Sequence, residues 1–295
     1  MHLVYIIIAH KKPQQIVRLI KQLYHKDDYF FIHIDKRVDI VPFIEKFKDE
    51  KINVSFVKKR ENGRWGDIGV VKATLNALFE IKQKEIDYTH VSLLSGEDFP
   101  IKSTDYIRDF FFKNKNKSYI EYEPFPVEKL EYGGLHRIES YSFNIFNKRE
   151  TYVPMKWNPT FNYKGMILNF FLGIYSLFLQ KRIKLNNWKH YYGSQWWSLS
   201  KTVVNCILNT IENNPQYLRF HKYSLLSDEM FFQTVAINKC YDNKIENNNF
   251  RFIRMLDEKS HPEFLTEKNM TEILESNSLF ARKFEDTGFL EKYLK

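Results

Sequence analysis

The chain has 295 residues, of which 43% are hydrophobic and 17% aromatic, with only 10 Gly and 9 Pro. That composition predicts a folded globular protein with a sizeable core and excludes a disordered chain. The net charge of +9 favours an anionic partner, either nucleic acid, an acidic membrane surface or a phosphorylated small molecule. The only cysteines, Cys206 and Cys240, are too few for a disulfide scaffold and point to a reducing compartment.

The N-terminal part of the chain alternates short apolar runs with amphipathic helical patterns. Strands are predicted over 3–10, 29–35, 52–59 and 90–96, and helices over 13–24 and 69–84. The opening "MHLVYIIIAHKKP" is read as the first strand and not as a secretion signal, because its apolar run is short and no small-residue cleavage site follows. The alternation is typical of an α/β fold built on a mostly parallel sheet.

Polar residues follow these strands at His10, at 35–37 and at 95–98. Ligands bind at the carboxyl ends of the strands in such sheets, so we expect these residues to gather at one edge, in a nucleotide-type site. The sequence has no glycine-rich phosphate motif, no close-set cluster of metal-ligating His and Cys, and no Ser-His-Asp nucleophile elbow. Their absence excludes several large enzyme classes.

The run "GMILNFFLGIYSLFLQKRIK", residues 165–184, predicts an apolar helix with a basic end. Its apolar part is shorter than the roughly 20 residues that span a bilayer. We expect a buried helix, and the alternative is an interfacial helix whose basic end docks on anionic lipid. A strand over 193–200 and a helix over 201–214 follow.

The stretch "YSLLSDEMFFQTVAI", residues 223–237, predicts a helix that starts at Ser227. Ser227 has the chemistry of an N-cap, and Asp228 and Glu229 suit the positive end of the helix dipole. Taken alone, this stretch is better explained by capping than by catalysis.

Seven stretches, taken together, indicate one protein family. They are "FIHIDKR", "RWGDIGVVKATLNAL", "VSLLSGEDFPIKS", "GSQWWSLS", "SDEMFFQT", "NFRFI" and "LFARKF". Their order and spacing resemble the core 2/I-branching β-1,6-N-acetylglucosaminyltransferases and the related peptide O-xylosyltransferases, over nearly the whole chain. The resemblance implies an inverting glycosyltransferase with the GT-A nucleotide-sugar fold that works without a metal ion. The sequence agrees, because it contains no Asp-x-Asp motif.

In that family basic side chains neutralise the leaving diphosphate, and the matching residues here are Arg251 and Lys283. Fixed cations in a poorly hydrated site stabilise such a charge most, and the planar fork of Arg and the point charge of Lys can hold different oxygens. Arg254 is an alternative to Arg251. Family members often have an aspartate and a tryptophan soon after their arginine, where this chain has Arg254 and Met255. Without the resemblance, Lys283 would be interpreted as a solvated charge.

Four residues match the donor side of the family. Asp35 and Arg37 fall where the family reads the uridine, Trp65 would flank the donor sugar, and Asp98 would bind the donor. The residues alone leave other roles open: a strand-end turn for Asp35 and Arg37, a packing aromatic for Trp65, and a turn cap for Asp98.

The segment "GSQWW" matches the acceptor wall, with Ser194 and Gln195 as hydroxyl binders and Trp196 as a stacking surface for a sugar ring. Trp196 and Trp197 alternate along a strand, so only one of them can face the cleft. The xylosyltransferases have an acidic residue where this chain has Gln195, which argues against their protein acceptor.

The resemblance assigns Glu229 as the catalytic base, because it is in register with the family's base in "SDEMFFQT". One carboxylate is enough for inversion, since it only has to take the proton of the attacking hydroxyl. Asp228 is then the helix cap or a partner of Glu229.

We therefore expect a GT-A-like α/β fold in one unit, with a donor half over 1–122 and an acceptor half over 123–295. The expected donor is UDP-GlcNAc, with UDP-xylose as the alternative, and the expected acceptor is a saccharide or lipid-linked saccharide of a bacterial surface polysaccharide. No metal or other cofactor is expected. The expected location is cytoplasmic, with peripheral contact to the inner face of the membrane if the acceptor is lipid-linked. The alternative from another class is a basic nucleic-acid-binding protein, but no nucleic-acid-binding signature is found.

Overall fold

The computed structural model describes residues 2–48, 50–145, 148–152, 163–179, 182, 188–240, 244–255 and 262–293. A central sheet of seven strands has the order β12-β6-β11-β4-β1-β2-β3. Strands β1 (His2–Ala9), β2 (Tyr29–Ile34), β3 (Val54–Phe56) and β4 (Tyr88–Ser95) are parallel. Strand β11 (Trp197–Ser200) is antiparallel between β4 and β6 (Lys117–Ile120), and β12 (Lys244–Glu246) is parallel to β6. The predicted α/β fold with a mostly parallel sheet is confirmed.

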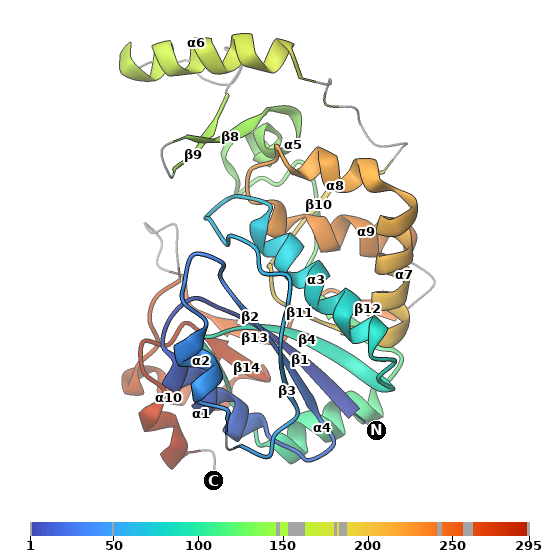
Figure 1. Cartoon of the computed structure of the whole chain (residues 1–295), viewed down its shortest axis with the longest axis vertical. Coiled ribbons are helices and arrows are strands. Elements are labelled where there is room, and N and C mark those ends of the chain that lie inside the picture. The colour runs from blue at the N-terminus through green and yellow to red at the C-terminus, as the bar shows by residue number, and fades with distance from the viewer. Residues whose placement is uncertain are drawn as a thin grey trace.

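Side chains of β1 alternate between the two faces of this sheet. Val4 and Ile6 belong to one hydrophobic core, whereas Leu3, Tyr5 and Ile7 belong to the other. Helices α3 (Gly69–Gln83), α7 (Lys201–Asn213) and α9 (Phe231–Lys239) close the first core, and α1 (Pro13–Leu23), α4 (Thr104–Lys113) and α10 (Met270–Glu275) close the second (Figure 1). A strand that is buried on both faces reads as a continuous apolar run, as β1 does.

A second sheet of three strands places the C-terminal part of the chain next to the end of β4. Its order is β13 (Arg251–Ile253), β14 (Phe280–Arg282) and β5 (Asp98–Pro100). In the antiparallel pair of β14 with β5, Arg282 stands opposite Asp98. Residues far apart in the sequence are thus placed side by side at the edge of the main sheet.

The remaining short elements are mostly around the sheet and beyond one edge. They are α2 (Val41–Glu45), β7 (Glu123–Pro124), η1 (Glu131–Gly134), α5 (His136–Glu139), β8 (Ser142–Ile145), β9 (Lys148–Thr151), α6 (Tyr163–Leu177), β10 (Tyr191–Tyr192), α8 (Pro215–His221), η3 (Ser227–Glu229), η4 (Glu267–Asn269) and η5 (Gly288–Lys292). Helix α6 and the β8–β9 hairpin lie at the top of Figure 1, away from the sheet.

The prediction of a buried helix over 165–184 is wrong for residues 167–179, and 180, 181, 183 and 184 of the predicted basic end lie outside the described residues. Helix α6 ends at Leu177, and large apolar side chains of the helix and of the residue that follows it face solvent: Phe170 is 65% exposed, Leu177 82% and Phe178 81%. Of the apolar side chains described in the helix, Leu172 is the buried one. Among the described residues, no helix combines the length and the apolar character needed to cross a bilayer.

Two further expectations change. The helix predicted from Ser227 begins instead at Phe231, and residues 227–229 form a separate 3₁₀ turn. Ser227 caps no helix, because its hydroxyl donates to the carbonyl of His221. The two cysteines, which the sequence analysis took as a sign of a reducing compartment, form a disulfide between Cys206 in α7 and Cys240 at the end of α9.

Candidate active site

The carboxyl ends of β1, β2 and β4 and the start of β11 meet at one edge of the sheet. The polar residues that follow these strands gather there, as predicted. His10 lies close enough to these residues for their charges to act on its pKa. Burial and Lys11 lower the pKa of His10, while the carboxylates of Glu97 and Asp35 raise it. This edge is therefore a dense array of charges supplied by three different strands.

Asp35 supports Arg37 and the following loop. Its Oδ1 accepts hydrogen bonds from the backbone N and Nε of Arg37, and its Oδ2 accepts from Arg37 Nη2 and from the backbone N of Gly63. Burial would raise the pKa of Asp35, but these hydrogen bonds and the charge of Arg37 lower it to about 2. The carboxylate is thus ionised, and both of its oxygens accept hydrogen bonds from within the protein. The guanidinium of Arg37 is half exposed and open to a ligand.

Asp98 is fully buried and acts within the protein. It accepts from the backbone N and the hydroxyl of Ser95, which closes the turn after β4, and from Arg282 Nε over 3.0 Å. The guanidinium of Arg282 in turn lies 4.1 Å from the ring centroid of Trp196. The expected donor contact of Asp98 is therefore replaced by a turn and an ion pair, and Trp196, only 5% exposed, is not an open stacking surface.

Lys283 lies at the same edge and remains partly exposed. Its Nζ is 3.3 Å from Glu97 Oε2, and Lys11 Nζ is 2.8 Å from Glu97 Oε1. One carboxylate thus holds two ammonium groups side by side, one after β1 and one after β14. Such a pair of fixed cations is a suitable site for a diphosphate.

Arg251 does not have the open position that the resemblance implied. It is buried, and it donates to the backbone carbonyls of Asn249, Leu93 and Trp197. Burial lowers its pKa to about 9, so it is still charged at neutral pH. Its rival Arg254 is more exposed but is paired with Glu263 and Glu272. The structure places both arginines in structural contacts, whereas Lys283, Lys11 and Arg37 are among the described cations at this edge that keep exposed surface.

Glu229 meets a cation that sequence reasoning missed. Arg137 in α5 donates from Nη1 to Glu229 Oε2 over 2.7 Å. Burial raises the pKa of Glu229 against the opposing effect of Arg137, and Glu121 adds to the rise. The side chain is 30% exposed, and no described residue donates a hydrogen bond to its Oε1. A raised pKa and an open oxygen are the two properties that a general base needs near neutral pH.

Asp228 is not a helix cap, because α9 begins only at Phe231. Its Oδ1 is buried without a hydrogen-bond partner among the described residues. Burial and the neighbouring charge of Glu229 raise its pKa to about 7. Asp228 is therefore a second carboxylate with a perturbed pKa, directly beside the candidate base.

The segment that was predicted to bind the acceptor contacts the backbone of Glu229. Gly193 N donates to the carbonyl of Glu229 over 2.8 Å. A Cβ at Gly193 would lie 1.9 Å from the carbonyl oxygen of Glu121, so only glycine fits there. Ser194 follows, and its carbonyl accepts from the side chain of Gln233 in α9. Gln195 is half-buried and makes no hydrogen bond to the described part of the chain, which leaves its amide free for a ligand.

The loop that carries Trp65 reaches the same turn. Trp65 is 68% exposed, so its ring is open to a ligand and is not the packing aromatic of the alternative interpretation. The carbonyl of the next residue, Gly66, accepts a hydrogen bond from the backbone N of Leu226. The loop on the donor side and the turn that carries Glu229 are therefore linked by one peptide hydrogen bond.

The described residues contain no group of three or more His, Cys, Asp and Glu side chains placed to hold a metal ion. Asp35, Asp98, Glu97 and Glu229 are paired with arginine, lysine or backbone partners, and Oδ1 of Asp228 has no hydrogen-bond partner among the described residues.

Comparison with known proteins identifies the family of the chain. The model of the family "Branch: Core-2/I-Branching enzyme" matches residues 3–274, which is most of the chain. The chain belongs to the core-2/I-branching enzyme family of glycosyltransferases. The prediction of this family from seven short stretches is confirmed.

Three relatives illustrate the range of the family. A xylosyltransferase of Ciona intestinalis is 24% identical over 84% of this chain and 26% of its own length. Xylosyltransferase 2 of Homo sapiens is 23% identical over 84% and 26%, and the β-glucuronosyltransferase GlcAT14B of Arabidopsis thaliana is 24% identical over 95% and 62%. The chain thus spans about a quarter of the xylosyltransferases that it matches.

Among solved structures, that of S. aureus TarS 1-349 in complex with UDP-GlcNAc aligns over 48% of this chain and 39% of its own, with 16% identity. The TM-score of 0.30 is too low for this likeness to support a conclusion.

The buried carboxylate of Asp228 predicts a pH-dependent stability. Its pKa is raised on folding, so the folded state binds more protons than the unfolded state between about pH 4 and 7, and stability falls as the pH rises through that window. We expect Asp228→Asn to raise the melting temperature at pH 8 and to have a smaller effect at pH 5. Thermal unfolding of both proteins at the two pH values measures this. A variant that is less stable than the native protein at pH 8 would contradict it.

The contacts of Arg251 predict a structural role. Arg251→Met leaves three buried carbonyls without their donor and should cost about 2–4 kcal/mol in urea unfolding. The matched variant Arg254→Met removes only surface ion pairs and should cost less than about 1 kcal/mol. Unchanged stability of Arg251→Met together with a loss of UDP affinity would return Arg251 to the donor site.

Proposed function

We propose that this protein transfers a sugar from a UDP-sugar to a hydroxyl group of a saccharide acceptor, with inversion and without a metal ion. The observation that carries the proposal is the carboxylate of Glu229: its pKa is raised, one oxygen is held by Arg137, and the other is open. The family assignment supports the reaction class.

In this reaction the acceptor hydroxyl donates its hydrogen bond to Glu229 Oε1, and the carboxylate takes its proton as the oxygen attacks the anomeric carbon. Arg137 keeps Oε2 occupied, so the proton is directed to the other oxygen. Attack comes from the side opposite the leaving group, and one base is sufficient because no covalent intermediate forms. When Asp228 and Glu229 are both ionised, the repulsion between the two carboxylates raises the affinity of the pair for a proton.

The leaving UDP carries the developing negative charge. Lys283 and Lys11, held by Glu97, and Arg37, held by Asp35, keep exposed surface at this edge and are proposed to bind the diphosphate and the nucleoside. Cations already held in place stabilise the leaving group without reorganisation during the reaction. In this proposal they do the work that a metal ion does in other enzymes.

UDP-GlcNAc is the proposed donor and UDP-xylose the alternative, because relatives of this chain are named xylosyltransferases. The proposed acceptor is a saccharide or lipid-linked saccharide of a bacterial surface polysaccharide, and the proposed location is cytoplasmic with peripheral membrane contact. A thermal-shift series with UDP-GlcNAc, UDP-xylose and UDP-glucuronic acid distinguishes the donors, since a ligand that binds the folded state raises the melting temperature.

The role of Glu229 is tested by Glu229→Gln. The amide keeps the shape but cannot take a proton, so we expect the transfer rate to fall on the order of 10²- to 10⁴-fold with UDP affinity nearly unchanged. Initial rates and UDP binding measure this. The matched variant Asp228→Asn should retain most activity. An active Glu229→Gln protein, or an inactive but folded Asp228→Asn protein, would show that the base is the other carboxylate.

The role of the fixed cations is tested by Lys283→Ala. We expect weaker UDP binding and slower turnover, because the diphosphate loses a cation in the ground state and in the transition state. Lys102→Ala, a change of a lysine whose ammonium bonds a carbonyl outside the site, is the control. Native transfer should persist in excess EDTA. Activity that disappears in EDTA and returns with manganese would overturn the metal-free reaction.

A further inference from the structure

Helix α6 presents a continuous apolar stripe to solvent. Ile167, Phe170, Ile174 and Leu177 are all exposed and recur at intervals of three and four residues, and Phe178, which directly follows the helix, is exposed as well. Residues at this spacing lie on one face of a helix, so the stripe runs from Ile167 to the end of the helix. A face of this size, aromatic and aliphatic throughout, is unusual for a surface that only meets water.

The opposite side of α6 is seated firmly. Leu172 is buried, a Cβ at Gly173 would lie 3.0 Å from the ring of Tyr152, and the ring centroids of Tyr175 and Phe143 are 5.3 Å apart. The helix is therefore held on the β8–β9 hairpin, with its stripe turned outward.

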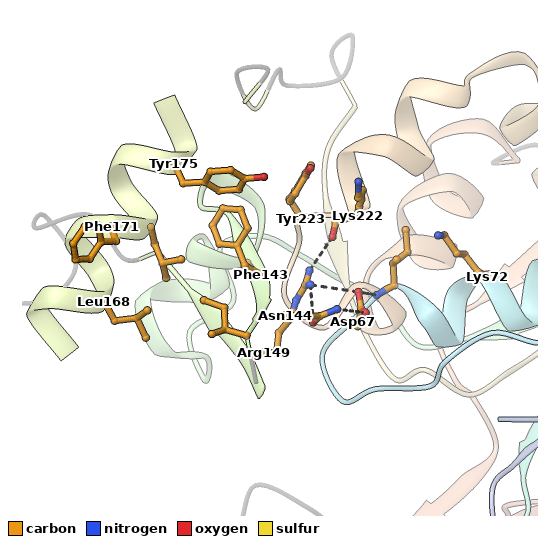
Figure 2. Close-up of a pocket in the computed structure, with 14 residues that line it drawn as sticks. Asp67, Lys72, Phe143, Asn144, Arg149, Leu168, Phe171, Tyr175, Lys222 and Tyr223 are labelled. Carbon is orange, nitrogen blue, oxygen red and sulfur yellow. Dashed lines mark hydrogen bonds and ion pairs between the residues drawn. The ribbon is translucent and has the colours of Figure 1, made fainter. Parts of the chain in front are cut away.

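A pocket of about 580 Å³ lies between α6 and the main body. Figure 2 shows its two unlike walls: Leu168, Phe171 and Tyr175 of α6 on one side, and Lys72 and Lys222 on the other. Phe171 and Tyr175 are also exposed, so the apolar wall of the pocket continues into the stripe of α6.

The two lysines are available to an anion. Neither Lys72 nor Lys222 forms an ion pair with any residue that the structure describes, and Lys222 is exposed with its ammonium above the ring of Tyr223. The one acidic residue of the pocket, Asp67, is already satisfied by Arg149 and by the amide of Asn144. The pocket therefore offers two uncompensated positive charges beside an apolar wall.

From this arrangement we infer that α6 and its pocket form a docking site for an anionic lipid bilayer. The stripe lies in the interfacial region of the membrane, and the phosphate of an anionic headgroup enters the pocket between Lys72 and Lys222. The charges of the lysines complement the headgroup, while the stripe and the pocket wall accept the adjoining acyl chains. An anionic bilayer presents negatively charged headgroups directly beside a hydrocarbon surface, which matches the two unlike walls of the pocket and the stripe.

The site is also connected to the candidate active site through direct contacts. Arg149 lines the pocket, and its Nη2 donates to the backbone carbonyls of Lys222 and Ser224, a few residues before Glu229. The pocket and the turn that carries Glu229 are therefore joined by hydrogen bonds of one arginine. The inference of lipid docking itself does not depend on the proposed transferase activity.

Co-sedimentation of the whole protein with vesicles tests the site. We expect binding to vesicles that contain phosphatidylglycerol, weak binding to pure phosphatidylcholine, and release by salt. Lys72→Gln/Lys222→Gln should weaken binding roughly 10- to 30-fold. The control Lys46→Gln/Lys115→Gln removes the same charge from two exposed positions that do not line the pocket, and it should change binding less than about threefold. Equal losses in the two variants would overturn the pocket as the headgroup site.

The stripe is tested by Phe170→Ser/Leu177→Ser, two exposed positions that do not line the pocket, against Val41→Ser/Tyr106→Ser on α2 and α4. The first variant should lose vesicle binding and the second should retain it, with the melting shift by UDP unchanged in both. Retained binding in the first variant overturns the inference. So does a lipid-free dimer that this variant converts to a monomer, because the stripe would then cover a second copy of the chain.

Discussion

The candidate site depends on a partly buried acidic pair that is held by a cation from a distant part of the chain. Placing Asp228 and Glu229 next to each other in a poorly hydrated turn is unfavourable, because two carboxylates repel and both lose water. Arg137 stabilises the pair only if α5 is docked against the turn. Arg182 achieves this docking, since its guanidinium donates to backbone carbonyls of α5 and of α8 at once. The position of Glu229, the proposed base, therefore depends on contacts between side chains and backbone far outside its own turn.

Buried arginines explain part of the basic composition. Arg149, Arg182 and Arg251 all donate to backbone carbonyls, and burial lowers the pKa of each. For Arg182 and Arg251 the pKa is still about 9, so they remain charged inside the protein. A net charge of +9 is thus not wholly available to partners. Two groups of cations with exposed surface are the ones used in the proposals, those around Glu97 and the lysines of the pocket beside α6.

Local patterns in the sequence predicted the strands, the parallel sheet and the edge at which charges gather, because each depends on apolar runs and on the residues that follow them. They did not predict that helix α9 starts at Phe231, since the backbone N of Leu226 bonds to Gly66 and holds residues 227–229 in a separate turn. Arg137 could not be found either, because it stands 92 residues from Glu229 and no motif links them. The buried state of Arg251 follows from its strand β13 pairing with β14, which spacing alone does not show.

The 3₁₀ turn at residues 227–229 is the point where three separate segments meet. The loop of Trp65 reaches it through Gly66 and Leu226, the acceptor-side segment through Gly193, and α5 through Arg137. Two of these three contacts are made by backbone atoms, so they hold the turn whatever side chains the neighbouring positions carry. A base that must lie within hydrogen-bonding distance of one hydroxyl needs this precision, since a misplacement of about 1 Å can reduce the rate roughly 10²-fold. The loop proposed to flank the donor, the segment proposed to bind the acceptor and the proposed base are thus positioned by the same few residues, which is why the geometry of this turn, more than any single cation, defines the candidate site.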